Sequence, residues 1–520
     1  MTTDVRAARL CLALALLAFG WAVFASAWLC DDAWITLRSI DNLLSGYGLR
    51  WNPAERVQTF THPAWALLLT FAIATSGEST LTVLGVSLVC TAGAVALMVR
   101  HIAPAPALAA LGVVALLTSK AFVDYSTSGL ENPLTHLLLA IFIALWFRDA
   151  DDSRPERRLL ALTLVTAALA VNRLDAALLV APAVAVAASA CGRAAWRPLA
   201  LGMLPLVTWE GFALLYYGFP FPNTAYAKLA TGIPITELAL QGLRYLQDAC
   251  LRDPATPLAI LLGCSLAAWR APRALPLALG VVLYLAYVVR IGGDFMSGRY
   301  MAAPLFCAAA LLCRWPRDSG WPALRVPAAL ASVLLIVSLS SSHPPLMTSL
   351  DYGVGWTPDP GYHGIVDERA GYYPVTGLWR TLAAGANPLQ HPWAAAAAAD
   401  RRRPDRVLLA GPIGLYGYHV GPEKIVVDAF ALADPLRSRL PLPHGSAWRI
   451  GHFPRRVPEG YLETLATGRN QIADASLAAL WDDLARVTRD PLFTAARWRA
   501  ILRLNLMSLP HQPAVESTER

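Results

Sequence analysis

The sequence has little charge for its length. Only 15% of its 520 residues are charged, whereas 56% are hydrophobic and the mean hydropathy is +0.45. Soluble proteins carry about 25% charged residues, so this apolar excess cannot all be packed inside globular domains. The composition excludes a disordered chain, a collagen and a small disulfide-stapled secreted domain. It predicts a membrane protein with several spans.

Lysine is almost absent, because it occurs only at Lys120, Lys228 and Lys424 and the other 40 of the 43 basic residues are arginine. The formal net charge of +7 suggests nucleic acid as a partner. The arginines, however, lie mostly in short loops between apolar runs, where positive residues mark the cytoplasmic side of a membrane protein. We therefore exclude nucleic acid and attribute the positive balance to topology.

Several sequence motifs are also missing. No HExxH, GxSxG or paired CxxC motif occurs, and the glycine-rich segment 292–298 lacks the spacing of a nucleotide-binding loop. These absences give no support to a zinc protease, a serine hydrolase of the GxSxG type or a P-loop enzyme. No cysteine follows Cys313, so the C-terminal third of the chain has no disulfide and no cysteine-based metal site.

Twelve apolar runs predict the spans: 8–29, 63–76, 80–99, 104–119, 133–147, 159–171, 176–191, 199–217, 256–268, 275–289, 301–313 and 326–340. The basic loops place residues 148–158, 193–197, 270–273 and 314–325 in the cytoplasm, with Arg317 among their arginines. The loops 30–62, 120–132, 172–175, 218–255 and 290–300 then face outward. An even number of crossings is needed between residues 62 and 120, so we interpret 63–76 as a re-entrant or interfacial helix. About eleven spans remain.

The C-terminal part differs in character. Residues 1–340 are predicted to form the membrane domain with its outer loops, and residues 341–520 an extracytoplasmic α/β soluble domain. Short strands are expected at 406–410 and 424–428, and helices at 376–385, 458–468 and 475–489.

The unusual polar residues fall at the outer ends of the predicted spans, where ionisable groups are costly and usually functional. Asp31 and Asp32 directly follow the first span. Two adjacent carboxylates repel each other unless a cation, a metal or a substrate hydroxyl compensates, so they are candidates for a general base and its helper. A simple helix-capping pair is the alternative.

The other outer motifs have the same two interpretations. Glu131 stands before a span, as a substrate ligand or as a helix cap. Arg173 and Asp175 share a four-residue turn, where they either pair with each other or bind phosphate.

Asn223 and Lys228 belong to a segment rich in aromatic residues, which suits membrane anchoring as well as binding. Two further motifs follow: a glycine-rich turn with Asp294 and Arg299, which could cradle a phosphate, and His452, which could be purely structural.

Taken together, these segments resemble the GT-C polytopic glycosyltransferases, and among them the actinobacterial terminal arabinofuranosyltransferases. The matching segments cover most of the chain in the same order: 31–38, 42–53, Glu55–Arg56, Thr61–Pro63, Ser128–Glu131, Asn172–Asp175, 222–228, 292–295 and 414–452.

The resemblance implies a GT-C membrane fold and a glycosyltransferase with a polyprenyl-phosphate sugar donor, related to decaprenyl-phosphoryl arabinose, that acts on the outer face of the bacterial cytoplasmic (inner) membrane. It implies Asp31 as the base, with Asp32 as helper or substitute. The donor phosphate is expected at Arg299, Lys228 and Arg173. The remaining substrate-binding candidates are Arg38, His62, Glu131, Asp175, Asn223, Asp294 and His452.

The resemblance leaves the substrates open. The sugar is expected to be D-arabinofuranose, and the acceptor a glycan, a lipid or a protein outside the cytoplasm. A mannosyl- or aminoarabinosyltransferase of the same superfamily is the alternative enzyme, and a non-catalytic polyprenyl-lipid transporter the alternative class. A transporter would favour charges at mid-membrane between repeats, and neither is seen. The one candidate cofactor is a divalent cation.

Overall fold

The computed structural model describes residues 3–148, 154–229, 231–314, 325–355, 362–385, 391–443, 445 and 447–506. Arg317 of the predicted cytoplasmic loop lies outside these residues. The described part is almost entirely helical and contains two short strands. It divides into two compact units, which are described separately. The first unit comprises Met1–Ala33, His62–Val207 and Pro234–Gln390, and the second comprises Trp34–Thr61, Thr208–Ile233 and His391–Arg520.

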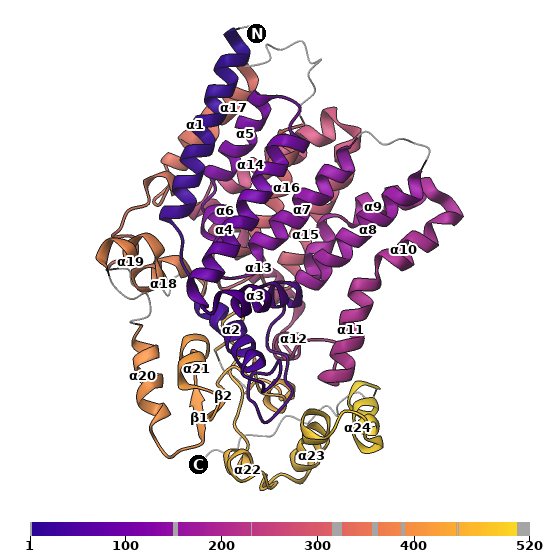
Figure 1. Ribbon diagram of the computed structural model, residues 1–520, viewed down its shortest axis with the longest axis vertical. Coiled ribbons are helices and arrows are strands. Elements are labelled where there is room, and N and C mark those ends of the chain that lie inside the picture. Colours follow the sequence, from indigo (N-terminus) through magenta and orange to yellow (C-terminus); the bar gives the residue numbers. More distant parts are fainter. Residues whose placement is uncertain are drawn as a thin grey trace. The chain divides into compact units, whose positions relative to one another are not determined.

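The first unit is a bundle of apolar helices (Figure 1). Helix α1 (Thr3–Ala25) packs on α5 (Pro106–Leu117), and α4 (Thr80–Leu97) packs on α7 (Asn132–Phe147), which also contacts α8 (Pro155–Asn172). Helix α16 (Ala302–Leu312) contacts α5, α7, α14 (Ala255–Arg270) and α15 (Leu275–Arg290). Every residue of α16 is buried, so this helix forms the centre of the bundle.

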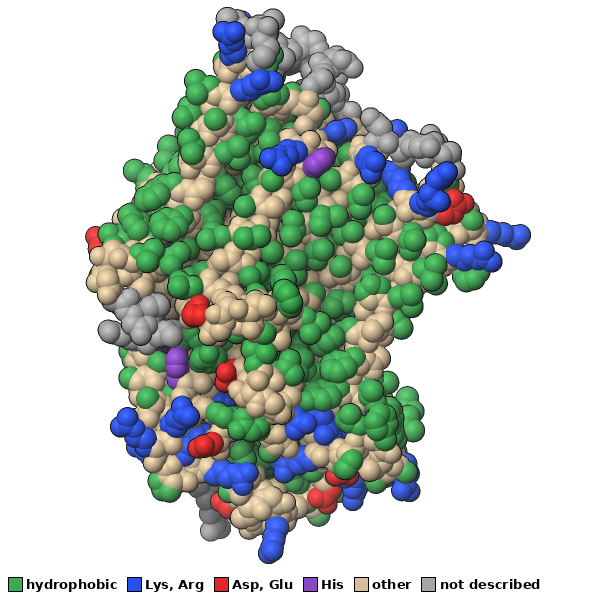
Figure 2. Space-filling model, in the orientation of Figure 1, with side chains coloured by type: hydrophobic (Ala, Val, Ile, Leu, Met, Phe, Trp, Pro, Cys, Tyr) green, Lys and Arg blue, Asp and Glu red, His purple; other side chains and the backbone are tan. Residues whose placement is uncertain are grey.

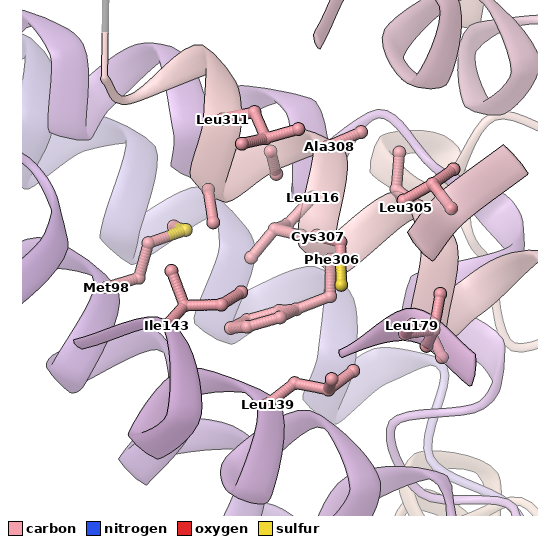
Figure 3. Packing of buried hydrophobic residues seen from close by; sticks show 14 of the residues in the cluster. Met98, Leu116, Leu139, Ile143, Leu179, Leu305, Phe306, Cys307, Ala308 and Leu311 are labelled. Atoms are coloured by element: carbon pink, nitrogen blue, oxygen red, sulfur yellow. The ribbon is translucent and has the colours of Figure 1, made fainter. Parts of the chain in front are cut away.

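Small residues let these helices approach closely. Helix α16 carries five alanines, and Figure 3 shows Phe306 and Cys307 of this helix among leucine and isoleucine side chains from its neighbours. A Cβ atom at Gly263 of α14 would lie 2.5 Å from the carbonyl oxygen of Ala308. Close backbone contact through small residues is typical of helices that pack inside a membrane.

The helices of this unit are apolar on their outer faces as well. Leu17 of α1 and Val89 of α4 are about seven-tenths exposed, and Figure 2 shows hydrophobic side chains over most of the visible face of these helices. Within the described residues, three helices are long and apolar enough to cross a membrane: Asp4–Ala25, Thr80–Ile102 and Pro272–Arg290. A fourth candidate is the pair Ala181–Gly202 and Leu204–Tyr216, which is bent by 44°.

The described part of the chain also contains six shorter apolar helices, at Pro63–Ser76, Pro106–Leu117, Asn132–Phe147, Ala255–Trp269, Arg299–Leu312 and Arg325–Leu339. The prediction of a multi-span helical membrane protein is therefore supported in its coarse form. The number of eleven spans, and the re-entrant role of α3 (Pro63–Ser76), stay predictions.

The predicted cytoplasmic and outer loops gather in two separate sets within the first unit. In one set, Arg314 Nη1 donates to the carbonyl of Ile102 at 3.3 Å, and the Trp146 indole donates to the carbonyl of Arg273 at 2.7 Å. In the other set, Cys30 N donates to Ser128 O at 3.0 Å. The assignment of the two sets to the cytoplasmic and the outer side stays a prediction.

Part of the predicted C-terminal domain folds within the first unit. Helices α18 (Glu368–Thr376) and α19 (Leu378–Ala384) are fixed to the end of α1, because Tyr373 Oη donates to Ala25 O at 2.7 Å and Leu378 N to Ala27 O at 2.9 Å. Val366 also pairs with Met296 in an isolated parallel β-bridge. The predicted domain boundary at residue 340 stays a prediction. In the structure, residues up to Gln390 belong to the first unit.

The second unit contains the two predicted strands. β1 (Val407–Ala410) pairs in parallel with β2 (Ile425–Asp428), with Val407 opposite Ile425. The helices expected at 458–468 and 475–489 are present as α22 (Tyr461–Thr467) and α23 (Ala475–Arg489). The helix expected at 376–385 is α19 of the first unit. Further helices of the second unit are α20 (Pro392–Arg401), α21 (Gly414–Val420) and α24 (Ala495–Leu506). The sequence periodicity therefore predicted these elements correctly.

Candidate functional site

The acidic pair begins a helix of its own. Asp31 and Asp32 are the first two residues of α2 (Asp31–Leu44), and both are half-buried. Acidic side chains are favourable in the first turn of a helix because the helix dipole is positive there. The residue before the pair donates its backbone N–H to Ser128 O, and a Cβ at Gly129 would lie 2.7 Å from Ala33. The structure thus brings the acidic pair against the predicted 128–131 motif.

An aromatic residue that the sequence analysis missed faces the same turn. Tyr372 of α18 stacks on Trp28, with 6.3 Å between ring centroids and 20° between the planes. Burial, with the negative charges of Asp31 and Glu368, raises the pKa of the Tyr372 phenol far above its ordinary value. This phenol therefore stays protonated at neutral pH and is a hydrogen-bond donor beside the acidic pair.

Glu131 is the centre of a buried charge network. Its carboxylate is 1% exposed and lies 3.2 Å from His62 Nδ1. Arg173 Nη1 donates to one of its oxygens, and Arg299 Nη2 lies 3.3 Å from both. Glu131 occupies the residue before α7 but makes no side-chain capping hydrogen bond. Glu131 is thus the N-cap residue of α7 by position, but its carboxylate turns to the arginines.

The two arginines bring two further predicted acids into the network. Arg173 Nε lies 2.8 Å from Asp175 Oδ1, so the pairing expected within this turn is confirmed. Arg299 Nη1 lies 3.4 Å from Asp294 Oδ2. Three carboxylates thus face two guanidinium groups and the imidazole of His62. Such mutual pairing is how buried charges are tolerated.

The arginines hold Glu131 in its charged form. Burial alone would raise the pKa of this carboxyl, but Arg299, Arg173 and the hydrogen bond to His62 outweigh burial and hold the pKa well below its ordinary value. An efficient general base has a pKa near the working pH. Glu131 is thus a fixed anion, and the acidic pair on α2 is the better candidate for the base.

Arg173 and Arg299 differ in how many of their guanidinium nitrogens already have a hydrogen-bond partner. Each nitrogen of the Arg173 guanidinium has a carboxylate partner, and the group lies 4.5 Å from the Tyr300 ring centroid. Arg299 Nε is buried and has no hydrogen-bond partner within the described residues. A buried unpaired donor is costly, so Arg299 has a donor left for a ligand oxygen.

A second charge cluster fixes α18 to the bundle. Lys120 lies 3.0 Å from Asp367 and also pairs with Asp124, and Arg369 pairs with Asp124. Tyr352 Oη donates to Asp367 at 2.5 Å. Two cations thus balance two carboxylates, and nothing of this cluster was predicted from the sequence. Its role is to position α18, and with it Tyr372.

The remaining predicted site residues belong to the second unit. Arg38 is buried and donates to the carbonyls of Trp51, Lys424, Gly421 and Gly417. The Asn223 amide donates to the carbonyls of Ala431, Leu432 and Asp434 at 3.0–3.1 Å. His452 lies edge-on to Phe430, with 4.8 Å between ring centroids. Lys228 lies in the last turn of α12 (Asn223–Leu229) and is exposed. Their binding roles stay predictions.

A metal site is not evident where the chain is described, since no three histidine, cysteine or acidic side chains gather there as ligands. The residues that sequence reasoning missed are Trp28, Lys120, Asp124, Asp367, Arg369 and Tyr372. Lys120 and Asp124 pair at i,i+4, but Trp28 and Arg369 reach Asp124 from segments more than 90 residues away, so local spacing could not have shown the cluster as a whole. The only signal was the rarity of lysine, which singles out Lys120.

The chain is similar in sequence to two known proteins. It is 29% identical to a terminal β-(1→2)-arabinofuranosyltransferase of Mycobacterium tuberculosis over an alignment 540 positions long, which covers 85% of this chain and 83% of the relative. The protein of the same name from Corynebacterium glutamicum is 27% identical over 352 residues, which is 58% of this chain and 50% of the relative. No family model matches the chain.

Among solved structures, ArnT from Cupriavidus metallidurans bound to undecaprenyl phosphate aligns with a TM-score of 0.47 and 15% identity, over 83% of this chain and 91% of that chain. The two arabinofuranosyltransferase relatives confirm the resemblance drawn from the motifs and, with it, the expectation that the chain is a glycosyltransferase.

Proposed function

We propose that this chain transfers D-arabinofuranose from a polyprenyl-phosphate donor to a glycan, lipid or protein acceptor outside the cytoplasm. The observation that carries the proposal is the acidic turn of α2, which lies against the Ser128–Glu131 segment. The names of the two relatives support the sugar.

The acidic turn supplies the base in this proposal. An acceptor hydroxyl attacks the anomeric carbon of the donor sugar and gives its proton to the Asp31 carboxylate. A new C–O bond forms, the bond between the anomeric carbon and the phosphate oxygen breaks, and polyprenyl phosphate leaves with the bonding electrons. Asp32 and the Tyr372 hydroxyl would orient Asp31 or the acceptor. A divalent cation at the acidic pair is an additional option.

Arg299 is the donor-phosphate ligand that the contacts favour most. The leaving phosphate gains negative charge, which a positioned guanidinium stabilises. Arg299 has a buried Nε without a partner in the described residues, whereas Arg173 is fully committed to Glu131 and Asp175. Glu131, Asp294 and His62 would then act as positioning residues for Arg299. Lys228 is the other phosphate candidate.

The proposed location is the bacterial inner membrane, with the acidic turn on the periplasmic or outer side. The arginine-rich loop set would face the cytoplasm by the positive-inside rule, and the set that contains Asp31, Glu131 and Arg299 would face outward. The C-terminal residues would follow on that outer side.

The proposal is tested by transfer of labelled sugar in proteoliposomes. The full chain is supplied with synthetic decaprenyl-phosphoryl arabinose and, separately, with mannose and aminoarabinose donors. Transfer from the arabinose donor alone is expected. Transfer from another donor would replace the sugar assignment, and transfer from none would overturn the proposal.

The phosphate assignment has its own test. Arg299→Gln is expected to raise the KM for the donor about tenfold or more, since a charge-assisted hydrogen bond to phosphate is worth about 1.5–3 kcal/mol. Arg290→Gln, at the exposed end of α15, is the matched control. An unchanged KM and kcat in Arg299→Gln would remove Arg299 from the site.

A further inference from the structure

The last helix of the second unit, α24, is fixed to the end of an apolar helix. Arg497 Nη2 donates to the carbonyl of Tyr216 at 3.1 Å, and the Asn505 amide donates to the carbonyl of Gly218 at 2.9 Å. These two carbonyls stand at the end of α11 (Leu204–Tyr216), which is part of the bent candidate span. Helix α24 therefore stands where a candidate membrane helix ends.

The end of α11 has the composition of a membrane–water interface. Trp209, Phe212 and Tyr216 form one aromatic row, with 5.3 Å between the ring centroids of each neighbouring pair. These residues belong to the second unit, and Phe212 and Leu214 are 38% and 37% exposed. Tryptophan and tyrosine are enriched where membrane helices meet water. We therefore expect the end of α11, and α24 with it, at the membrane surface.

The outward face of α24 combines leucine with arginine. Leu502 is 55% exposed and Leu506 is 78% exposed. Arg499 and Arg503 are exposed on the same side of the helix, because these four positions are spaced three or four residues apart. The sequence of α24 contains no acidic residue. Arginine and leucine together on an outward face are typical of helices that lie in a membrane interface.

The positive charge of this face is not cancelled by the neighbouring helix α23. Arg503 Nη1 lies 2.8 Å from Asp483 Oδ2, and Arg486 Nη1 lies 3.0 Å from the other oxygen of the same carboxylate. Two guanidinium groups thus share one buried carboxylate. Arg499 Nε donates to a backbone carbonyl of its own helix at 3.4 Å. Three cations therefore stand against one anion, and the face attracts negative charge.

We propose that α24 binds the anionic headgroups of the lipid bilayer and thereby holds the second unit at the membrane surface. Leu502 and Leu506 would enter the boundary between the headgroups and the acyl chains, where apolar side chains leave water. Arg499 and Arg503 would donate hydrogen bonds to lipid phosphates. This surface does not depend on the proposed sugar transfer, because it follows from the attachment, the exposure and the charge of α24.

The test measures whether α24 lies near lipid headgroups in the full chain. Leu502→Cys and Leu409→Cys are made in a parent chain in which the exposed Cys11 and Cys250 are replaced by serine. Leu409 in β1 is the matched control, because it is 54% exposed and belongs to the same unit. Each new thiol carries a fluorophore, and the unmodified parent chain gives the background. Nanodiscs of phosphatidylcholine, with or without phosphatidylglycerol, carry a headgroup spin label that quenches nearby fluorophores.

Phosphatidylglycerol should increase the quenching at Leu502→Cys about twofold or more, since each arginine near an anionic surface strengthens binding about fivefold. The increase should be lost when Arg499→Gln and Arg503→Gln are added. It should be retained with Arg402→Gln and Arg406→Gln, which change two exposed arginines of the same unit. High salt should reduce it, because charge attraction is screened.

Three results would overturn the inference. Equal quenching at Leu502→Cys and Leu409→Cys would mean that α24 does not lie at the membrane surface. Quenching that is independent of phosphatidylglycerol, or unchanged by the Arg499 and Arg503 substitutions at equal Tm, would exclude anionic lipid as the partner and would leave the arginines for an acidic protein. The expected quenching pattern supports the inference even if no sugar transfer is found.

Discussion

Arg299 Nη2 lies 3.3 Å from both carboxylate oxygens of Glu131, and both side chains are buried. The two residues are 168 positions apart in the chain and stand at the ends of different helices. This pair connects the loop before α7 with the loop before α16, and Arg173 connects the same carboxylate with the end of α8. One carboxylate thus fixes three ends of the bundle beside the acidic turn.

Removal of the Glu131 charge should therefore destabilise the first unit. In Glu131→Gln, two buried guanidinium groups lose their shared anion, and breaking a buried ion pair typically costs about 3–5 kcal/mol. Thermal unfolding in detergent should show a clearly lowered Tm. Glu156→Gln, an exposed acid in the first turn of α8, is the control and should leave Tm unchanged. Equal Tm values for all three proteins would contradict the role of Glu131.

The same network predicts a pH dependence. The pKa of Glu131 is held well below its ordinary value of 4.5 in the folded chain, so its contribution to stability is fully present above that value and is lost as the pH falls below it. The difference in Tm between wild type and Glu131→Gln should be constant from pH 9 to about 5.5. It should shrink below about pH 4. A difference that already disappears between pH 7 and 5 would mean that the carboxyl titrates there and is not a fixed anion.

Arg38 should stabilise the second unit through its hydrogen bonds to backbone carbonyls. Its guanidinium donates to carbonyls of the segment that precedes β2, including Lys424 O at 3.1 Å and Gly421 O at 3.2 Å. A lysine cannot reach several carbonyls with a planar fork, so Arg38→Lys should lower the free energy of unfolding of the second unit by about 2–3 kcal/mol. Faster limited proteolysis within residues 391–443 would report this change. The exposed Arg402→Lys serves as control, and a proteolysis rate equal to that of wild type in Arg38→Lys would refute the assignment.

The local sequence pattern predicted the helices and strands better than it predicted which side chains contact each other. The short apolar runs predicted β1 and β2 to within one residue, whereas the assignment of the loops to the two sides of a membrane stays a prediction. The spacing of Glu131, Arg173 and Arg299 could not show that they meet, because ion pairs between distant loops leave no local signal. Three of the four carbonyls that Arg38 contacts belong to residues 417–424, so local spacing could not show these contacts either.

Asp367 shows a further limit of the sequence. It lies in the segment that composition assigned to a separate outer domain, yet it pairs with Lys120 inside the first unit. Composition records where a chain becomes less apolar, and it does not record which unit that part packs against.

The most direct test of the account is sugar transfer by Asp31→Asn. The substitution keeps size and helix-start preference but removes the carboxylate that would accept the proton, so kcat should fall by about 100-fold or more while Tm and donor KM stay near wild type. Asp41→Asn, an exposed position on the same helix, should retain full transfer. A kcat equal to wild type in Asp31→Asn, at equal folding, would contradict the assignment of Asp31 as the base.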